Sequence, residues 1–347
     1  MEATPQQLKA LPPPLLAWYD ENRRVLPWRE QVSPYRTWVS EIMLQQTRVT
    51  AVLPYFDRFM AALPTVAALA DAPEQQLMSL WQGLGYYSRA RNLQKAAQVI
   101  MTRHGGVFPD TYEGLTALPG VGDYTAGAIA SIAFGQPVPA VDGNVLRLAA
   151  RLTGCDDNVL EPKTRVRFRR WMAEVIPSDR PGAFNQALMD LGAMVCLPNG
   201  APLCEQCPAR TFCTACEKGL QRQLPVREKK TARRVEQSTV FLLRQEDAIA
   251  LRQRPATGLL AGLWEFPNVP GALTERQAAE QLAKWGLVPH RWGKSFTDKH
   301  VFTHITWEMT VFTITVQGAG PPEWVWCPDE EREKYPMPTA FGKLEKE

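Results

Sequence analysis

Residues 118–126 of this chain read LPGVGDYTA, and residues 140–144, a short distance further on, read AVDGN. The proline presets a turn, and Gly120 and Gly122 allow a positive φ and a close approach by another backbone. The small, apolar residues 125–134 predict a tightly packed helix whose first amide groups can meet an anion. The stretch therefore predicts a hairpin that seats a phosphate, although a tight turn between two core helices has the same pattern.

The composition describes a folded chain with room for two or more domains. The 347 residues are 45% hydrophobic and carry a net charge of +3, which is too small to identify a partner. No apolar run approaches the roughly 18 residues that span a membrane. The N-terminus lacks a basic segment followed by an apolar one, so we expect neither export nor a membrane partner.

Two kinds of residue pattern divide the chain near residue 222. Before it, apolar periodicity and breaks at Pro and Gly predict helices at 14–22, 35–59, 73–81, 88–103, 112–117, 125–134, 144–152, 162–176 and 181–194. After it, β-branched and aromatic runs predict a helix at 275–285 and strands at 238–244, 248–253, 301–308 and 309–316. Residues 222–237 are rich in charged residues and interrupted by Pro225, as in a solvated linker. We therefore expect an all-α region, 1–221, and an α+β domain, 238–347.

Five of the seven cysteines are crowded into one short segment. They are Cys196, Cys204, Cys207 and Cys213, in the pattern C-x7-C-x2-C-x5-C, with Cys216 trailing. An odd number of cysteines, clustered in this way, argues against a disulfide framework and favours a metal site. Thiolates hold [4Fe–4S] clusters, but the two CxxC pairs also match a tetrahedral zinc site, and the spacing leaves both open.

Two acidic residues, Glu41 and Asp142, stand in informative places, but each has an ordinary explanation. On a helix, Glu41 shares a polar face with Thr37, Gln45 and Arg48, which is typical of a solvated acid. Asp142 precedes a predicted helix and fits its N-cap. The pattern by itself therefore assigns chemistry to neither residue.

A glycine-loosened segment at residues 81–91, WQGLGYYSRAR, places two tyrosines and two arginines beside a helix start. Aromatic edges that wedge between bases, with arginines for the phosphates, are a known means of opening a duplex. Tyrosines of an ordinary core would have the same pattern.

Taken in order, segments from most of the chain resemble the adenine DNA glycosylases of the MutY family, within the helix-hairpin-helix superfamily. They are LPWR (26–29), WVSEIMLQQTRV (38–49), LWQGLGYYSRARNL (80–93), LPGVGDYTAGAI (118–129), VDGNVLR (141–147), FNQALMDLGAMVC (184–196) and GLLAGLWEFP (258–267). The resemblance implies a six-helix barrel with the hairpin 118–122 and a cluster domain with cysteines 196–213, both within residues 1–221. A Nudix-like domain over residues 238–347 would follow.

The activity that the resemblance implies is base-excision repair, by hydrolysis of the N-glycosidic bond of adenine mispaired with 8-oxoguanine or guanine in duplex DNA. Glu41 matches the family's acid, which protonates the flipped adenine, and Asp142 matches the carboxylate that stabilises the oxocarbenium-like sugar. Asn144 would support the same centre. Strand-cleaving relatives carry a lysine nucleophile where this chain has Tyr124. We therefore expect a monofunctional enzyme that leaves an abasic site.

The resemblance also assigns residues to DNA. Tyr86 matches a wedge tyrosine, with Gln45 as its partner in the base stack. The full expected set is Arg29, Leu44, Gln45, Gln46, Arg48, Tyr86, Gly120, Gly122, Phe302, Thr303 and His304, of which Arg29, Leu44 and Gln46 match the lining of the adenine pocket. The last three stand where the family's Phe-Ser-His loop contacts 8-oxoguanine, and threonine keeps the serine hydroxyl while adding a methyl group.

A [4Fe–4S] cluster is the cofactor that the resemblance implies. Its expected ligands are Cys196, Cys204, Cys207 and Cys213, although seven residues separate the first two where the family has six. In the Nudix-like domain, Ala283 and Lys284 stand where a Nudix hydrolase needs metal-binding glutamates. We therefore expect this domain to read the opposite base.

The expected partner is duplex DNA with A:8-oxoguanine or A:G mispairs, bound by a monomer. Its location would be cytoplasmic and nucleoid-associated in a bacterium, or nuclear in a eukaryote. Two other hypotheses stay open: a bifunctional glycosylase/lyase like endonuclease III, and a non-catalytic DNA-binding protein stabilised by a metal.

Overall fold

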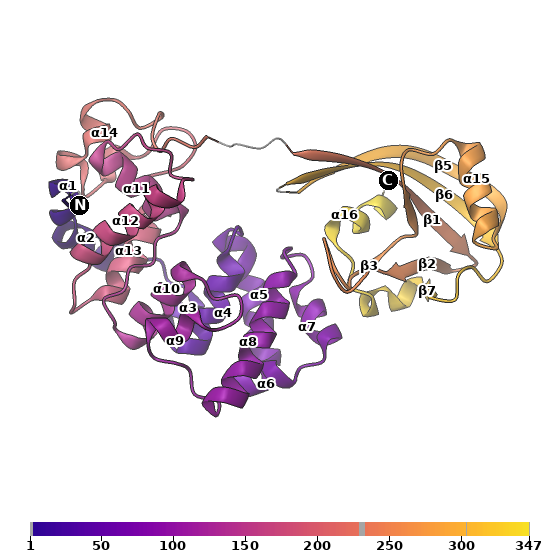
Figure 1. Ribbon diagram of the computed structural model, residues 1–347, viewed down its shortest axis with the longest axis horizontal. Helices are drawn as coiled ribbons and strands as arrows, with labels where there is room; N and C mark the ends of the chain where they lie inside the picture. The colour runs from indigo at the N-terminus through magenta and orange to yellow at the C-terminus, as the bar shows by residue number, and fades with distance from the viewer. Residues whose placement is uncertain (1–2, 229–232, 303, 347) are drawn as a thin grey trace. The chain divides into compact units, whose positions relative to one another are not determined.

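The computed structural model of the protein describes residues 3–228, 233–302 and 304–346 (Figure 1). They form two compact units, of which the first contains residues 3–72 and 91–228 and the second contains residues 73–90, 233–302 and 304–346. In chain order, helices come first and the strands follow, as the sequence predicts.

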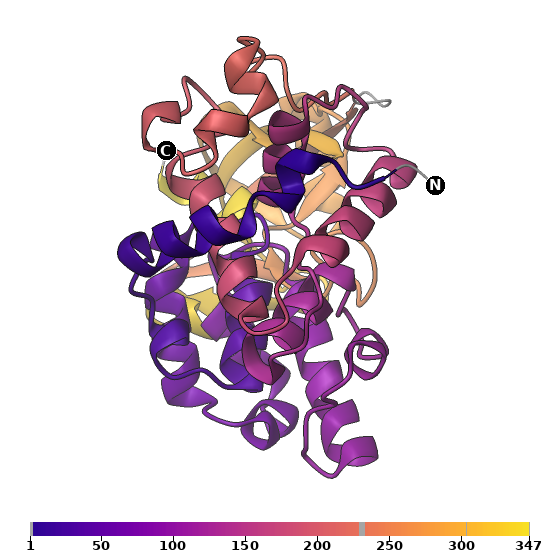
Figure 2. The same ribbon diagram turned by 90° about the vertical axis from the view of Figure 1, so that its left-hand side faces the viewer.

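Helices precede the sheet along the described chain. They are α1 (Gln6–Lys9), α2 (Pro12–Asn22), α3 (Pro27–Glu30), α4 (Pro34–Leu44), α5 (Val49–Ala62), α6 (Val66–Asp71), α7 (Glu74–Trp81), α8 (Ser88–His104), α9 (Tyr112–Thr116), α10 (Asp123–Phe134), α11 (Gly143–Thr153), α12 (Pro162–Val175), α13 (Pro181–Met194) and α14 (Thr214–Glu217), with short 3-10 turns η1 (Cys204–Gln206) and η2 (Arg210–Phe212). In the first unit, α1 contacts α11 and α12, and α2 contacts α13 (Figure 2). Leu15, Leu148, Trp171 and Phe184 belong to their common core.

The predicted helix 35–59 is wrong, because the structure has two helices there, α4 and α5. Gln46, between them, adopts a φ of +59°, a left-handed conformation that an α-helix does not contain. No Pro or Gly marks this break, and apolar residues recur on both sides of it, so the local pattern is that of one helix. The break releases residues 45–48 from helical geometry.

Helix α10 is packed as tightly as its small residues predict. Its residues 125–131 are buried. A Cβ on Gly127 would lie 2.4 Å from the carbonyl oxygen of Pro139, so only glycine fits there. In the hairpin before α10, a positive φ is needed only at Gly120, where it is +75°, because Gly122 is the N-cap of α10 and has a φ of −94°.

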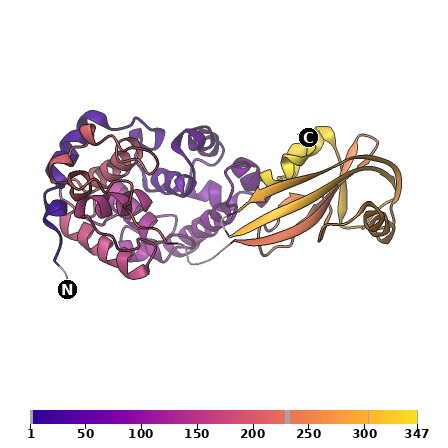
Figure 3. The same ribbon diagram turned by 90° about the horizontal axis from the view of Figure 1, so that it is seen from above.

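Within the described residues, the second unit contains a seven-stranded sheet. Its strand order is β3-β2-β1-β6-β5, with β4 paired to β1 and β7 paired to β2. The elements are β1 (Arg234–Gln245), β2 (Ala248–Gln253), β3 (Trp264–Glu265), β4 (Asn268–Pro270), α15 (Glu275–Lys284), β5 (Val288–Val301), β6 (Ile305–Gln317), β7 (Trp324–Pro328), η3 (Asp329–Lys334), α16 (Thr339–Gly342) and η4 (Leu344–Lys346). β1 runs parallel to β6, whereas β5 and β6 lie side by side as a long antiparallel pair (Figure 3).

Alternate side chains of β1 enter two different cores. Leu242 packs in a core with Phe341 of α16, and its neighbour Leu243 packs in a core with Leu282 of α15. Because successive side chains of a strand point to opposite faces, a helix covers each face of the sheet. The strands and helices after residue 234 therefore have the α+β character that the sequence predicts, and the second unit also contains residues 73–90, which the sequence predicts within the all-α region.

The strand predictions are only partly correct. The strand expected at 248–253 is confirmed as β2, but β1 begins at Arg234, inside the expected linker. The strands expected at 301–308 and 309–316 are a single strand from residue 305 onward, because β6 runs without a break from Ile305 to Gln317, and Val301 is the last residue of β5. Most of β5 was missed because its largely polar residues alternate between exposed and half-buried positions and form no apolar run.

Candidate active site

A cavity of about 1140 Å³ in the first unit collects residues from segments that are far apart in the sequence. It is lined by parts of α3, α4, α10, α11 and α13 together with the loop 45–48 and the hairpin. Eleven of the residues predicted to act on DNA line this one cavity: Arg29, Glu41, Leu44, Gln45, Gln46, Arg48, Gly120, Gly122, Tyr124, Asp142 and Asn144.

Glu41 is buried in α4, with only 5% of its surface exposed, so its helix face is not the solvated face of which its polar pattern is typical. Burial raises the pKa of Glu41 from 4.5 to about 7, against the opposing effects of the Tyr124 hydrogen bond and the Arg29 charge. Asp142 adds to the rise. A carboxyl group in this state holds a proton near neutral pH and can donate it.

The Tyr124 hydroxyl donates a hydrogen bond of 2.5 Å to Oε2 of Glu41. Burial, followed by the charges of Glu41 and Asp142, raises the pKa of Tyr124 well above 10, so its proton stays in place. Tyr124 thus orients the carboxyl group of Glu41. This contact has no sequence signal, since the two residues are 83 positions apart.

Asp142 is the N-cap of α11, as its position predicts, and it lines the cavity as well. Its carboxylate accepts from the backbone amides of Asn144 and Val145 at 2.8 and 2.9 Å, and from Nδ2 of Asn144 at 2.8 Å. Burial raises the pKa of Asp142, and these N–H groups act against the rise. The capping role and the place in the cavity are therefore compatible, because the cap holds the carboxylate at the cavity wall.

Arg147 and Gly192 fix the position of the Asn144 side chain. Its Oδ1 accepts from the buried guanidinium of Arg147 at 2.9 Å, and Arg147 also donates to the carbonyl oxygen of Gly192 at 2.8 Å. A Cβ on Gly192 would lie 2.6 Å from the Cβ of Asn144. The glycine thus leaves room for Asn144 beside Asp142.

No role at the site was predicted from the sequence for Asp190, Arg24 or Thr37. Asp190 of α13 is fully buried and pairs with Arg24 and Arg29, which both line the cavity. The signal is an acid inside the apolar stretch 187–192. Thr37 also lines the cavity, and its Oγ1 has no hydrogen-bond partner among the described residues.

The hairpin leaves its backbone open at the cavity. Gly122 is exposed, and a Cβ added there would meet nothing within 4 Å. The next residue, Asp123, is turned to other partners, because it accepts from the Tyr112 hydroxyl at 2.7 Å and pairs with Arg169. The amides at the start of α10 are therefore not capped by a side chain.

Three other predicted DNA contacts belong to the second unit and do not line this cavity. Tyr86 is 45% exposed, has a φ of +49°, and has the Arg89 guanidinium 5.4 Å from its ring centre. Phe302 stacks edge-on against Trp307, with ring centres 4.8 Å apart, and His304 is exposed. Thr303 lies outside the described residues.

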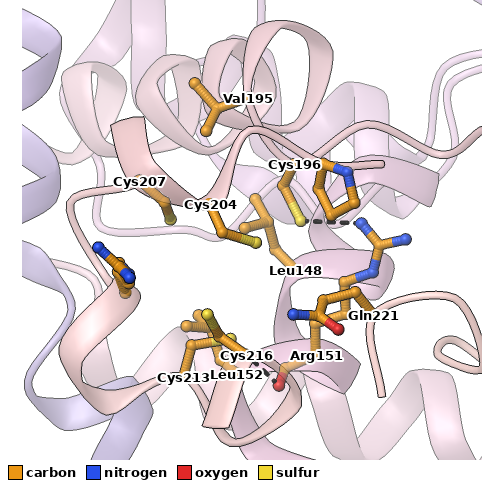
Figure 4. Close-up of a pocket in the computed structure, with 12 residues that line it drawn as sticks. Leu148, Arg151, Leu152, Val195, Cys196, Cys204, Cys207, Cys213, Cys216 and Gln221 are labelled. Atoms are coloured by element: carbon orange, nitrogen blue, oxygen red, sulfur yellow. Dashed lines mark hydrogen bonds between the residues drawn. The ribbon is translucent and has the colours of Figure 1, made fainter. Parts of the chain in front are cut away.

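All five clustered cysteines line a second, much smaller pocket (Figure 4). The Arg151 guanidinium donates to Sγ of Cys196 at 3.2 Å, and Sγ of Cys213 donates to the Arg151 carbonyl oxygen at 3.5 Å. Within the described ranges, no three His, Cys, Asp or Glu side chains converge closely enough for one metal ion. The pocket offers thiols at separate points of its wall, and thiolate is the donor that iron–sulfur clusters take.

Two family models of known proteins match this chain. Residues 39–174 match the family model of the HhH-GPD superfamily of base excision DNA repair proteins, and residues 239–347 match the NUDIX domain. A thermostable thymine-DNA glycosylase of known structure is 27% identical, with a TM-score of 0.55, over 62% of this chain and 100% of that one. A trapped endonuclease III–DNA covalent intermediate is 25% identical, with a TM-score of 0.51, over 59% and 93%. The fold and the site define a base-excision DNA glycosylase.

Longer matches identify the particular family. Human adenine DNA glycosylase is 37% identical over 95% of this chain and 72% of its own length, and the rat enzyme is 36% identical over 95% and 76%. The chain belongs to the adenine DNA glycosylase family. The predicted enzyme class, the two-part fold and DNA as the partner are thereby confirmed. None of the helices in the described ranges has the length and apolar character to cross a bilayer.

Proposed function

We propose that this enzyme hydrolyses the N-glycosidic bond of adenine paired with 8-oxoguanine or guanine in duplex DNA and leaves an abasic site. The observation that carries the proposal is the cavity that holds a buried, protonatable Glu41 together with Asp142. A base inside a duplex is out of reach of such a cavity, so the nucleotide must first leave the stack.

In the proposed reaction, Glu41 gives its proton to the extruded adenine, which turns the base into a better leaving group. Tyr124 keeps the carboxyl group of Glu41 oriented through its 2.5 Å hydrogen bond. Asp142, held by N–H groups of Asn144 and Val145, supplies negative charge to the oxocarbenium-like sugar. Water then completes the hydrolysis.

We propose that adenine is released without cleavage of the DNA strand, because of the residue types that line the cavity. A Schiff base needs an amine nucleophile. Tyr124 stands at the hairpin position where a lyase has lysine, and among the described residues that line the cavity no lysine occurs. These two observations favour the monofunctional enzyme over the bifunctional alternative.

Reading of the opposite base is proposed for the second unit. Phe302 and His304 lie between β5 and β6, and Phe302 is supported by Trp307. Ala283 and Lys284, at the end of α15, offer no carboxylates for the metal of a nucleotide hydrolase. We place the catalytic region at 1–221 and this reader in the part of the chain that begins with β1 at Arg234, inside the linker expected at 222–237.

The cysteine pocket is proposed to hold a [4Fe–4S] cluster in a monomeric enzyme, cytoplasmic in a bacterium or nuclear in a eukaryote. The proposed ligands are Cys196, Cys204, Cys207 and Cys213. When bound, the cluster would stabilise the loop between α13 and α14 by joining its thiolates. Arg151 supports the charge of such a group, because its guanidinium already contacts Cys196.

The test uses duplexes with A opposite 8-oxoguanine, G or T, incubated with the enzyme and then treated with hot alkali. Strand breaks at A opposite 8-oxoguanine and G are expected from the wild type, and Glu41→Gln should abolish them while retaining duplex binding. Glu113→Gln, an exposed carboxylate away from the cavity, is the matched control and should behave as wild type. No break in any duplex with the wild type would refute the proposal.

A further inference from the structure

Asp190 is a buried carboxylate that is saturated by two arginines. Its side chain is 0% exposed. Nη1 and Nη2 of Arg29 donate to its two oxygens at 2.7 and 3.0 Å, and Nε and the backbone amide of Arg24 donate at 2.8 and 3.2 Å. These bonds and charges outweigh the effect of burial and hold the pKa of Asp190 below its usual value. The carboxylate is therefore ionised beside Arg29.

Arg29 connects this pair to the reacting centre. Arg29 and Glu41 line the same cavity, and the Arg29 charge acts on the Glu41 carboxyl group. The charged and titratable groups that act on Glu41 are Tyr124 from α10, Arg29 from α3 and Asp142 before α11. Arg29 is the cation among them, and a cation with no counter-ion favours the ionised form of a neighbouring acid.

An ionised Glu41 has no proton to give, so a bare Arg29 would oppose the proposed chemistry. Both Nη groups of Arg29 donate hydrogen bonds to Asp190, which does not line the cavity. Asp190 thus supplies one negative charge against the positive charges of Arg29 and Arg24, and without it neither arginine has a counter-ion in this cluster. Low-dielectric surroundings make this compensation matter more than it would in water.

We propose that Asp190 is a positioning residue, which neutralises Arg29 and fixes its guanidinium so that Glu41 stays in its proton-donating form at neutral pH. The inference rests on the proposed function, because it assumes that Glu41 acts as an acid. The two proposals can be tested separately. Excision of adenine by the wild type tests the proposed function, and the pH dependence of the variants tests the role of Asp190.

The experiment measures single-turnover adenine excision as a function of pH. In the wild type the rate should fall as pH rises through the pKa of Glu41, at about 7. In Asp190→Asn this fall should move to lower pH by about one unit, because an uncompensated cation now favours ionised Glu41. Asp190→Glu, which keeps the charge, should restore the wild-type midpoint.

Arg24→Gln is the matched control, because it removes bonds to the same carboxylate and leaves the Arg29–Asp190 pair in place. Its midpoint should equal that of the wild type. A purely structural role of Asp190 predicts a lower melting temperature in Asp190→Asn with an unmoved midpoint, and that result would overturn the inference.

A second variant keeps the idea open to refutation if Asp190→Asn does not fold. Arg29→Gln removes the cation and leaves Asp190 bound to Arg24, so the midpoint should move to higher pH than in the wild type. A midpoint that stays in place would mean that Arg29 does not act on Glu41, and the inference would fail. Absence of excision by the wild type would remove the inference together with the proposed function.

Discussion

Replacing Glu41 by glutamine should stabilise the protein at neutral and alkaline pH while abolishing excision. The pKa of Glu41 is about 7 in the folded chain, against 4.5 for the free side chain, because burial disfavours its charge. The folded state therefore binds the Glu41 proton more tightly than the unfolded state does. The contribution of protonated Glu41 to stability is fully present below pH 4.5 and is lost as pH rises through about 7.

The size of the effect follows from the two pKa values. They differ by about 2.5 units, and at about 1.4 kcal/mol per unit the ionised side chain costs about 3 kcal/mol above pH 7. Glu41→Gln escapes this cost because glutamine stays neutral. The assay is denaturant unfolding of the wild type and Glu41→Gln at a series of pH values from 4.5 to about 7, the interval between the two pKa values. The difference in unfolding free energy should grow in favour of the variant as pH rises, and parallel curves would refute the reasoning.

Three further outcomes are expected. Borohydride should trap no efficient covalent adduct between the wild type and its DNA product, because Tyr124 supplies no amine; an adduct formed at the rate of excision would contradict this. Cys216→Ser should keep the brown colour and iron content of the purified enzyme and Cys213→Ser should lose them, as visible absorption and iron analysis will reveal; equal loss would assign Cys216 to the cluster. Gly127→Ala should lower the unfolding free energy by about 1–3 kcal/mol, since the new methyl group meets the carbonyl of Pro139, and an unchanged melting curve would count against that packing.

Local signals in the sequence predicted several parts of the site correctly. Asp142 was expected to cap the helix that follows it, and it does. The small residues of 125–134 predicted a buried helix, and no larger residue would fit at Gly127. These predictions hold because caps and close helix packing depend on residues that are near in sequence or on the size of one side chain.

Other parts of the site could not be predicted from local pattern. Glu41 occupies a polar stripe of its helix, and only the fold reveals that this stripe faces a cavity and not solvent. The turn at Gln46 has no glycine or proline to announce it. Asp190 is an acid in an apolar helix, and its pairing with Arg29 spans 161 positions.

The sequence by itself determined the order of a helical region and an α+β domain, the hairpin with its following helix, and through its motifs the likeness to a family. Only the tertiary structure decided the protonation of Glu41 and the partners of Asp190. The physical reason is that a pKa depends on the solvent and charges around a group in space. For Glu41 these come from α3, α10 and the start of α11, which local sequence does not bring together.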